Sequence, residues 1–152
     1  MKRITVFMLL TFLISYFGCE CLAESVQNKD NGKTNMETVN KKIKTLYNTM
    51  YKFMIDKNVL SLGKMLDDNF ILVHMTGLKQ NKQEYLNYIK NGTLNYFSNT
   101  TENIIIENNS KFIGQSKVSA AVFGGGKHTW NLELTIELTE NNLIKKITAS
   151  TY

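Results

Sequence analysis

The most regular feature of the chain is an alternation of apolar and polar residues near its C-terminus. The apolar positions are Trp130, Leu132, Leu134, Ile136 and Leu138, and the polar ones are Asn131, Glu133, Thr135 and Glu137. Because successive side chains of a strand point to opposite faces, this period of two predicts a strand with one face on a core. We predict further strands over 96–107, 112–123 and 143–152, separated by turns such as Gly124-Gly125-Gly126.

The preceding part of the chain has helical spacing instead. Apolar residues recur every three or four positions from Met36 to Met54, and Thr34 and Glu37 have the spacing of a capping box that opens this helix. We expect a short second helix over 59–66 that ends at Asp67-Asp68-Asn69, and then a buried strand over 70–74.

A turn at Thr76-Gly77 follows, and the Asn81–Glu84 capping pattern opens a third helix that ends at Asn91-Gly92. Three helices followed by grouped strands predict an α+β fold, with the helices packed on a strongly curved mixed or antiparallel sheet.

The N-terminus has the pattern of an export signal. Lys2 and Arg3 precede an apolar run over 4–17, and Cys21-Leu22-Ala23 has small residues where a signal peptidase reads. We therefore predict a signal peptide over 1–23, a flexible tether over 24–34 and one domain over 35–152, exported to a periplasm or secreted. A lipoprotein signal with a lipid anchor at Cys19 is the alternative. The apolar run is short for a membrane span, which needs about 20 residues.

Cysteine usage and charge narrow the function classes. Both cysteines precede the expected cleavage site, so the exported domain would fold without a disulfide. The net charge is +5, and its lysines are spread along the chain rather than gathered in a basic stripe with aromatic residues. This pattern argues against nucleic-acid binding. The histidines and cysteines have no metal-ligand spacing, so we expect no metal and no cofactor.

Two segments of the chain resemble one known family. The first runs from Leu66 to Gly77 and includes Asp67-Asp68-Asn69 and His74-Met75-Thr76-Gly77, and the second is Thr129-Trp130-Asn131-Leu132. They are similar to the nuclear transport factor 2-like superfamily, in particular its small bacterial branch related to SnoaL-like polyketide cyclases. The last strand differs, since Leu143-Ile144-Lys145-Lys146 stands where relatives often carry a tryptophan. The resemblance implies a cone, in which a bent sheet wraps around the first helix and encloses an apolar pocket. Members include isomerases, dehydratases, cyclases and proteins without a known reaction, so the fold alone does not give the function.

His74 is the candidate catalytic residue. It ends the buried strand on the face of Phe70 and Leu72, and an imidazole in an apolar pocket can act as a general base. The alternative is that His74 only fixes the Thr76-Gly77 turn. Asp67 and Asp68 are weaker candidates, because paired acidic residues at a helix end usually face solvent.

Aromatic residues and methionines are the candidate ligand-binding residues. They are Tyr47, Met50, Met54, Tyr88 and Trp130, with Tyr96 as a further pocket wall. Such side chains suit a flat apolar ligand, although ordinary core packing explains each of them equally well.

Two functional hypotheses follow. The first is an exported domain that binds a small apolar molecule and transforms it by acid–base chemistry of the isomerase, dehydratase or cyclase type. The second is a non-catalytic ligand-binding module or a homodimer that pairs through the outer sheet face, which carries Asn131, Glu133, Thr135 and Glu137. The first requires an open pocket that His74 faces.

Overall fold

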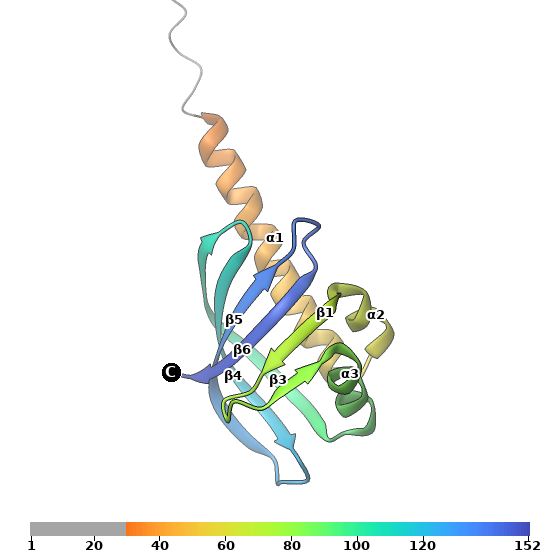
Figure 1. The fold of residues 1–152 in the computed structure, drawn as a ribbon. Helices are drawn as coiled ribbons and strands as arrows, with labels where there is room; N and C mark the ends of the chain where they lie inside the picture. Colours follow the sequence, from red (N-terminus) through yellow and green to blue (C-terminus); the bar gives the residue numbers. More distant parts are fainter. Residues whose placement is uncertain (1–29) are drawn as a thin grey trace, which may run out of the picture.

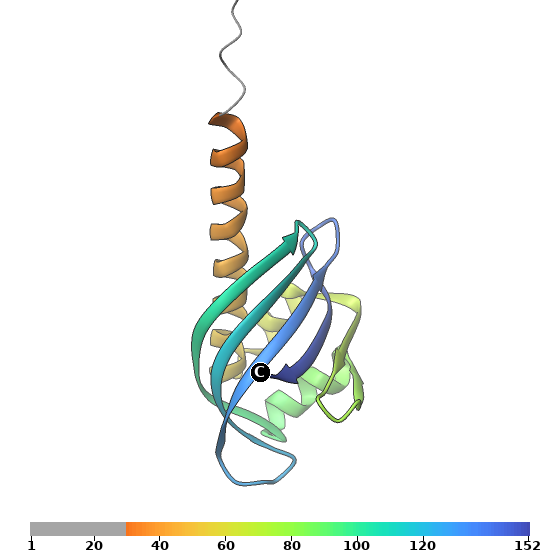
Figure 2. The ribbon, with the colours of Figure 1, turned by 90° about the vertical axis from the view of Figure 1, so that its left-hand side faces the viewer.

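A computed structural model describes residues 30–152, and the predicted leader, its predicted cleavage site, Cys19 and most of the expected tether lie outside them. A curved sheet wraps around one side of a long helix, and two shorter helices pack at the other end of the sheet (Figure 1). The first turns of the long helix project beyond the sheet (Figure 2). In the described part of the chain, no helix is long and apolar enough to cross a membrane.

The elements follow the order that the sequence predicts, with one additional short strand. They are α1 (Asp30–Ile55), α2 (Val59–Met65), β1 (Leu66–Val73), β2 (Lys79–Asn81), α3 (Lys82–Asn91), β3 (Leu94–Asn108), β4 (Lys111–Val122), β5 (His128–Leu138) and β6 (Ile144–Thr151). The sheet has six strands in the order β2-β1-β6-β5-β4-β3. Only the β1–β6 pair is parallel, so the described sheet is mixed. The predicted α+β architecture is confirmed.

Two predicted boundaries are wrong, and a short strand was missed. Helix α1 begins at Asp30, so the capping pattern at Thr34 does not open it and 30–34 is helical rather than part of a tether. No proline interrupts this stretch, so the helical hydrogen-bond ladder can continue upstream of Thr34. Strand β2 is only three residues long, which is too short for a period-two pattern to be recognised.

The second wrong boundary is the end of α2. This helix ends at Met65 and β1 begins at Leu66, so Asp67-Asp68-Asn69 belongs to a strand rather than to a turn. The pairing of β1 with β6 shifts register between Leu66 and Ile71, so these three residues occupy an irregular part of the strand where polar side chains are tolerated.

Other local predictions are confirmed. Asn81 and Glu84 form the capping box of α3, with the Glu84 N–H donating to Asn81 Oδ1 at 2.9 Å and the Asn81 N–H donating to Glu84 Oε2 at 3.0 Å. Gly92 ends this helix with a φ of 80°, which glycine adopts without a steric penalty. Along β5, Leu134, Ile136 and Leu138 are buried, as the alternation predicts.

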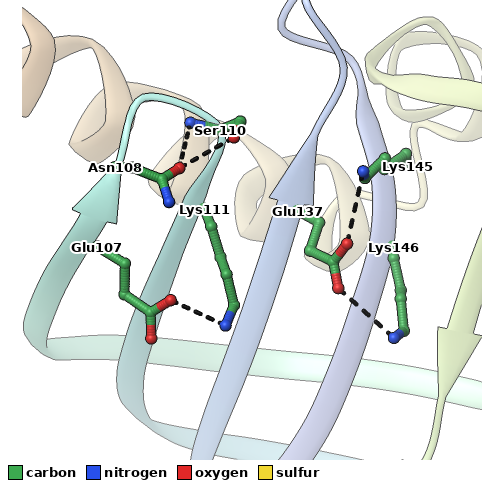
Figure 3. Close-up of polar contacts among 7 residues, drawn as sticks. All are labelled: Glu107, Asn108, Ser110, Lys111, Glu137, Lys145 and Lys146. Atoms are coloured by element: carbon green, nitrogen blue, oxygen red, sulfur yellow. Dashed lines mark hydrogen bonds and ion pairs between the residues drawn. The ribbon is translucent and has the colours of Figure 1, made fainter.

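The outer sheet face carries charged residues that pair within the chain. Glu137 lies 3.6 Å from the Nζ of Lys145 and 3.5 Å from that of Lys146, and Glu107 lies 2.8 Å from the Nζ of Lys111 (Figure 3). Exposed pairs of this kind contribute about 0–1 kcal/mol each. We therefore regard this part of the outer face as a solvated surface.

Candidate functional site

A cavity of about 160 Å³ lies between the inner face of the sheet, α1 and α3. Its apolar lining comes from helices and strands far apart in the sequence. These apolar residues are Met54, Leu72, Leu94, Ala120, Val122, Leu132, Leu134, Ile147 and Ala149. An apolar cavity of roughly 150 Å³ can hold one benzene molecule, so this space suits a ligand of about one ring.

The alternation of the strands explains why the cavity is apolar. Val118 pairs with Trp130, Ser116 with Leu132 and Gly114 with Leu134, so these positions of β4 and β5 share the concave face. Leu134 in turn pairs with Ala149 of β6, which extends the same face across the sheet. One face of a curved sheet thus converges on the space beside α1.

Tyrosines supply most of the polar atoms near the cavity. Tyr51, Tyr85 and Tyr96 line it, and a hydrogen bond links the hydroxyls of Tyr85 and Tyr96. The Tyr47 hydroxyl lies 3.0 Å from Ser116 Oγ. The rings of Tyr47 and Tyr51 pack edge to face, with their centroids 5.1 Å apart. The buried Tyr51 hydroxyl interacts electrostatically with the Tyr47 phenol, but it makes no hydrogen bond of ordinary geometry within residues 30–152.

Burial extends the pH range over which these phenols stay protonated beyond that of an ordinary tyrosine, which is already neutral at pH 7. It raises the pKa of Tyr51 well above its ordinary value, and the neighbouring Tyr47 and Tyr96 phenols raise it further. Burial also raises the pKa of Tyr85 well above the ordinary value and that of Tyr96 to about 12. At neutral pH the cavity wall therefore presents neutral O–H groups that can donate hydrogen bonds.

His74 follows β1 directly and lines the cavity. Its Nε2 lies 2.6 Å from the Oε1 of Gln80, a buried residue of β2. Because an amide oxygen only accepts, Nε2 donates in this arrangement, and a neutral imidazole then has its lone pair on Nδ1. Backbone groups close the adjacent turn, since the Gly77 N–H donates to the His74 carbonyl at 2.8 Å and the His74 N–H to the Leu78 carbonyl at 2.8 Å. The His74–Gln80 bond spans the same turn, so the imidazole also links the two sides of it.

The candidate residues that the sequence suggested fall into two groups in the structure. His74, Met54, Tyr96 and Trp130 line the cavity. Tyr47 and Met50 are fully buried in the core and do not line it.

Three further candidates also lie off the cavity wall. Tyr88 lies outside the lining, with its ring 5.9 Å from that of Phe123, which does line the cavity. Asp67 and Asp68 are also outside, and Asp68 pairs with the Lys82 Nζ at 2.9 Å.

Sequence reasoning missed Tyr51, Tyr85, Gln80 and Phe123. Tyr51 could have been found, because it follows Tyr47 by four residues and so shares its helix face. Gln80 had no sequence signal, since a single amide in a short polar segment is typical of a loop.

A larger hollow of about 800 Å³ lies between α1 and β3. Its lining includes solvent-exposed polar side chains such as Glu102, Asn103 and Glu107, and it contains none of the candidate residues from the sequence. The smaller cavity therefore has both buried walls and candidate reactive side chains, and the larger hollow has neither.

Comparison with known proteins identifies the fold. No family model matches the chain, and no curated protein matches it in sequence. Among solved structures, the epoxide hydrolase/cyclase-like enzyme SalBIII, which has a role in pyran ring formation in the polyether salinomycin, aligns with a TM-score of 0.61 at 10% identity, over 74% of this chain and 92% of that one.

Two bacterial proteins give the same result. A nuclear transport factor 2-like protein of unknown function in nutrient uptake from Rhodospirillum rubrum aligns with a TM-score of 0.59 at 18% identity, over 72% of this chain and 98% of that one. A nuclear transport factor 2-like protein from Cytophaga hutchinsonii aligns with a TM-score of 0.55 at 13% identity, over 83% of this chain and all of that one. Identities this low establish the architecture and leave the activity open. The protein has the nuclear transport factor 2-like fold.

Proposed function

We propose that this protein binds a small, largely apolar molecule of about one ring that carries a carbonyl or similar acceptor oxygen. The observation that carries the proposal is the Tyr51 hydroxyl, a buried donor beside an apolar cavity. This hydroxyl has an electrostatic interaction with Tyr47 but no hydrogen bond of ordinary geometry within residues 30–152. Leaving such a group unsatisfied costs about 1–3 kcal/mol. An acceptor oxygen on a bound ligand would recover that free energy.

The same residues suit acid–base chemistry. His74, with Nε2 bonded to Gln80, has an acceptor nitrogen available to remove a proton from carbon next to the carbonyl. The Tyr51 hydroxyl would donate to the oxygen on which negative charge then develops. Isomerisation, dehydration and ring closure can proceed through such an enolate with no cofactor. The likeness to a cyclase-like enzyme of the same fold supports this reaction class.

The pattern of the first 23 residues supports a further part of the proposal, that the domain works outside the cytoplasm. An exported ligand-binding domain without cysteines would be insensitive to the oxidising conditions there.

The experiment compares Tyr51→Phe with Tyr47→Phe, its neighbour one helical turn away. Binding of acetophenone is followed by NMR, through the chemical shift of the Trp130 indole N–H. Trp130 is the single tryptophan of the chain and lines the cavity. Tyr51→Phe should weaken acetophenone binding by about tenfold while slightly stabilising the fold, because it removes an unsatisfied donor. Tyr47→Phe should leave binding unchanged and destabilise the fold by about 1 kcal/mol, because it loses the bond to Ser116.

Ethylbenzene, which has the same shape without the oxygen, is the matched ligand control. It should bind the wild-type protein and Tyr51→Phe equally. Equal weakening of acetophenone by both tyrosine variants, or no response of the Trp130 signal to either compound, would refute the proposal.

A further inference from the structure

The backbone at Phe123 has a conformation that suits a different residue. Phe123 has a φ of 51° and Gly124 a φ of 78°, and the Gly125 N–H donates to the Val122 carbonyl at 3.0 Å. Two central residues with positive φ and this hydrogen bond are the pattern of a type I′ turn, whose first central position favours asparagine, aspartate or glycine. A bulky aromatic residue in this conformation is strained.

The two other described non-glycine residues with positive φ have local explanations. Asn142 belongs to a residue type that tolerates the left-handed conformation. Lys57 follows the C-terminus of α1, where helices often end with a left-handed residue. Phe123 has neither local explanation, and what distinguishes it is the position of its ring.

The ring of Phe123 lies at the mouth of the cavity. It is 5.8 Å from the His74 ring and 5.9 Å from the Tyr88 ring, and its side chain lines the cavity while being 50% exposed. The other exposed lining residues are Met75 and Thr76, in the turn that follows His74. The cavity therefore meets solvent between two turns, one after β1 and one after β4, which lie at the end of the molecule opposite the free end of α1 (Figure 1).

Both turns have an open side at their glycines. A Cβ atom added to Gly77 in the first turn or to Gly124 in the second would have no neighbouring atom within 4 Å. The Phe123 N–H is nevertheless tied to the Thr93 carbonyl at 2.8 Å. The ring is therefore carried by a turn anchored at one end and open to solvent at the other.

From the strained backbone and the ring position together, we infer that Phe123 is the specificity-determining residue of the cavity. Its ring closes the mouth, restricts the occupant to about one ring and slows exchange of the bound molecule. The strain is maintained because asparagine or glycine would leave the mouth uncovered. This inference rests on the proposed function, since it concerns the same cavity.

The test is Phe123→Asn, which keeps a residue suited to the turn and removes the ring. Phe97→Asn is the matched control, because Phe97 is a comparably exposed aromatic residue on β3 that does not line the cavity. Phe123→Asn should raise Tm by about 2 °C or more through relief of strain. It should also speed acetophenone dissociation about tenfold and admit the two-ring ketone 2-acetylnaphthalene, which we expect the wild-type protein to exclude. Phe97→Asn should change neither the dissociation rate nor the ketone size limit, and it should lower Tm because it loses the contact with Lys127 Nζ at 4.8 Å.

A second measurement does not depend on a bound ketone. Acrylamide quenching of Trp130 fluorescence reports access to the cavity, and its rate constant should increase at least twofold in Phe123→Asn only. If acetophenone fails to bind every variant but quenching increases, the proposed function fails and the role of Phe123 stands. If quenching, ketone size limit and dissociation rate match the wild type, the inference about Phe123 is overturned.

Discussion

The contact between Tyr47 and Gly114 allows a quantitative prediction about the core beside the cavity. Gly114 lies under the ring of Tyr47, and a Cβ atom at position 114 would lie 2.3 Å from Tyr47 Cε2 and 2.4 Å from Cζ. Both atoms belong to a fully buried ring, which also packs against the Phe112 ring with a centroid distance of 6.1 Å. The ring therefore has to shift if alanine replaces this glycine.

The expected cost of Gly114→Ala combines three contributions. Overpacking of a buried site costs about 1–3 kcal/mol. Displacing the ring also breaks the Tyr47–Ser116 hydrogen bond of 3.0 Å, which contributes about 1 kcal/mol. Alanine recovers about 0.5–1 kcal/mol relative to glycine in a strand. The free energy of unfolding should therefore fall by about 2 kcal/mol.

Urea unfolding followed by Trp130 fluorescence measures this change. With a slope of about 1.5 kcal/mol per molar urea, the midpoint should fall by about 1.3 M. The control is the same substitution in a Tyr47→Leu background, where the clashing ring atoms are absent and Gly114→Ala should raise the free energy of unfolding by about 0.5–1 kcal/mol. If Gly114→Ala lowers the free energy of unfolding equally in both backgrounds, the Tyr47 ring is not the reason that position 114 requires glycine.

Two further predictions concern pH and processing. The pKa of the Tyr96 phenol is near 10 in the unfolded chain and about 12 in the folded protein. Between these pH values the unfolded state binds fewer protons than the folded state. The free energy of unfolding should therefore fall as pH rises from about 10 to about 12. Simultaneous appearance of phenolate absorbance and loss of helical circular dichroism would agree with this expectation, whereas ionisation of the buried tyrosines in the intact fold would contradict it. Mass spectrometry of the exported protein should give a chain beginning at Glu24, and an intact leader or a lipid on Cys19 would exclude cleavage after Ala23.

Local patterns were sufficient for most of the fold. The period of two along β5, the helical spacing from Met36 to Met54 and the capping box of Asn81 and Glu84 each depend on residues a few positions apart. Boundaries failed where a neighbour in space decided the outcome. Asp67-Asp68-Asn69 is typical of a turn, yet it is drawn into β1 beside β6.

The site depended on contacts that a periodic pattern does not contain. Helical spacing places Tyr47 and Tyr51 on one face of α1. Only the Tyr47 hydroxyl, however, lies within hydrogen-bond distance of Ser116, 69 residues later, and the Tyr51 hydroxyl makes no hydrogen bond of ordinary geometry in the part of the chain that the structure describes. His74 was recognisable as a chemical group, whereas its bond to Gln80 required β2 to pair with β1. The sequence alone determined which residues face inward, because that follows from backbone periodicity. Only the tertiary structure decided which of them line a cavity, because that depends on how side chains from distant segments fill space.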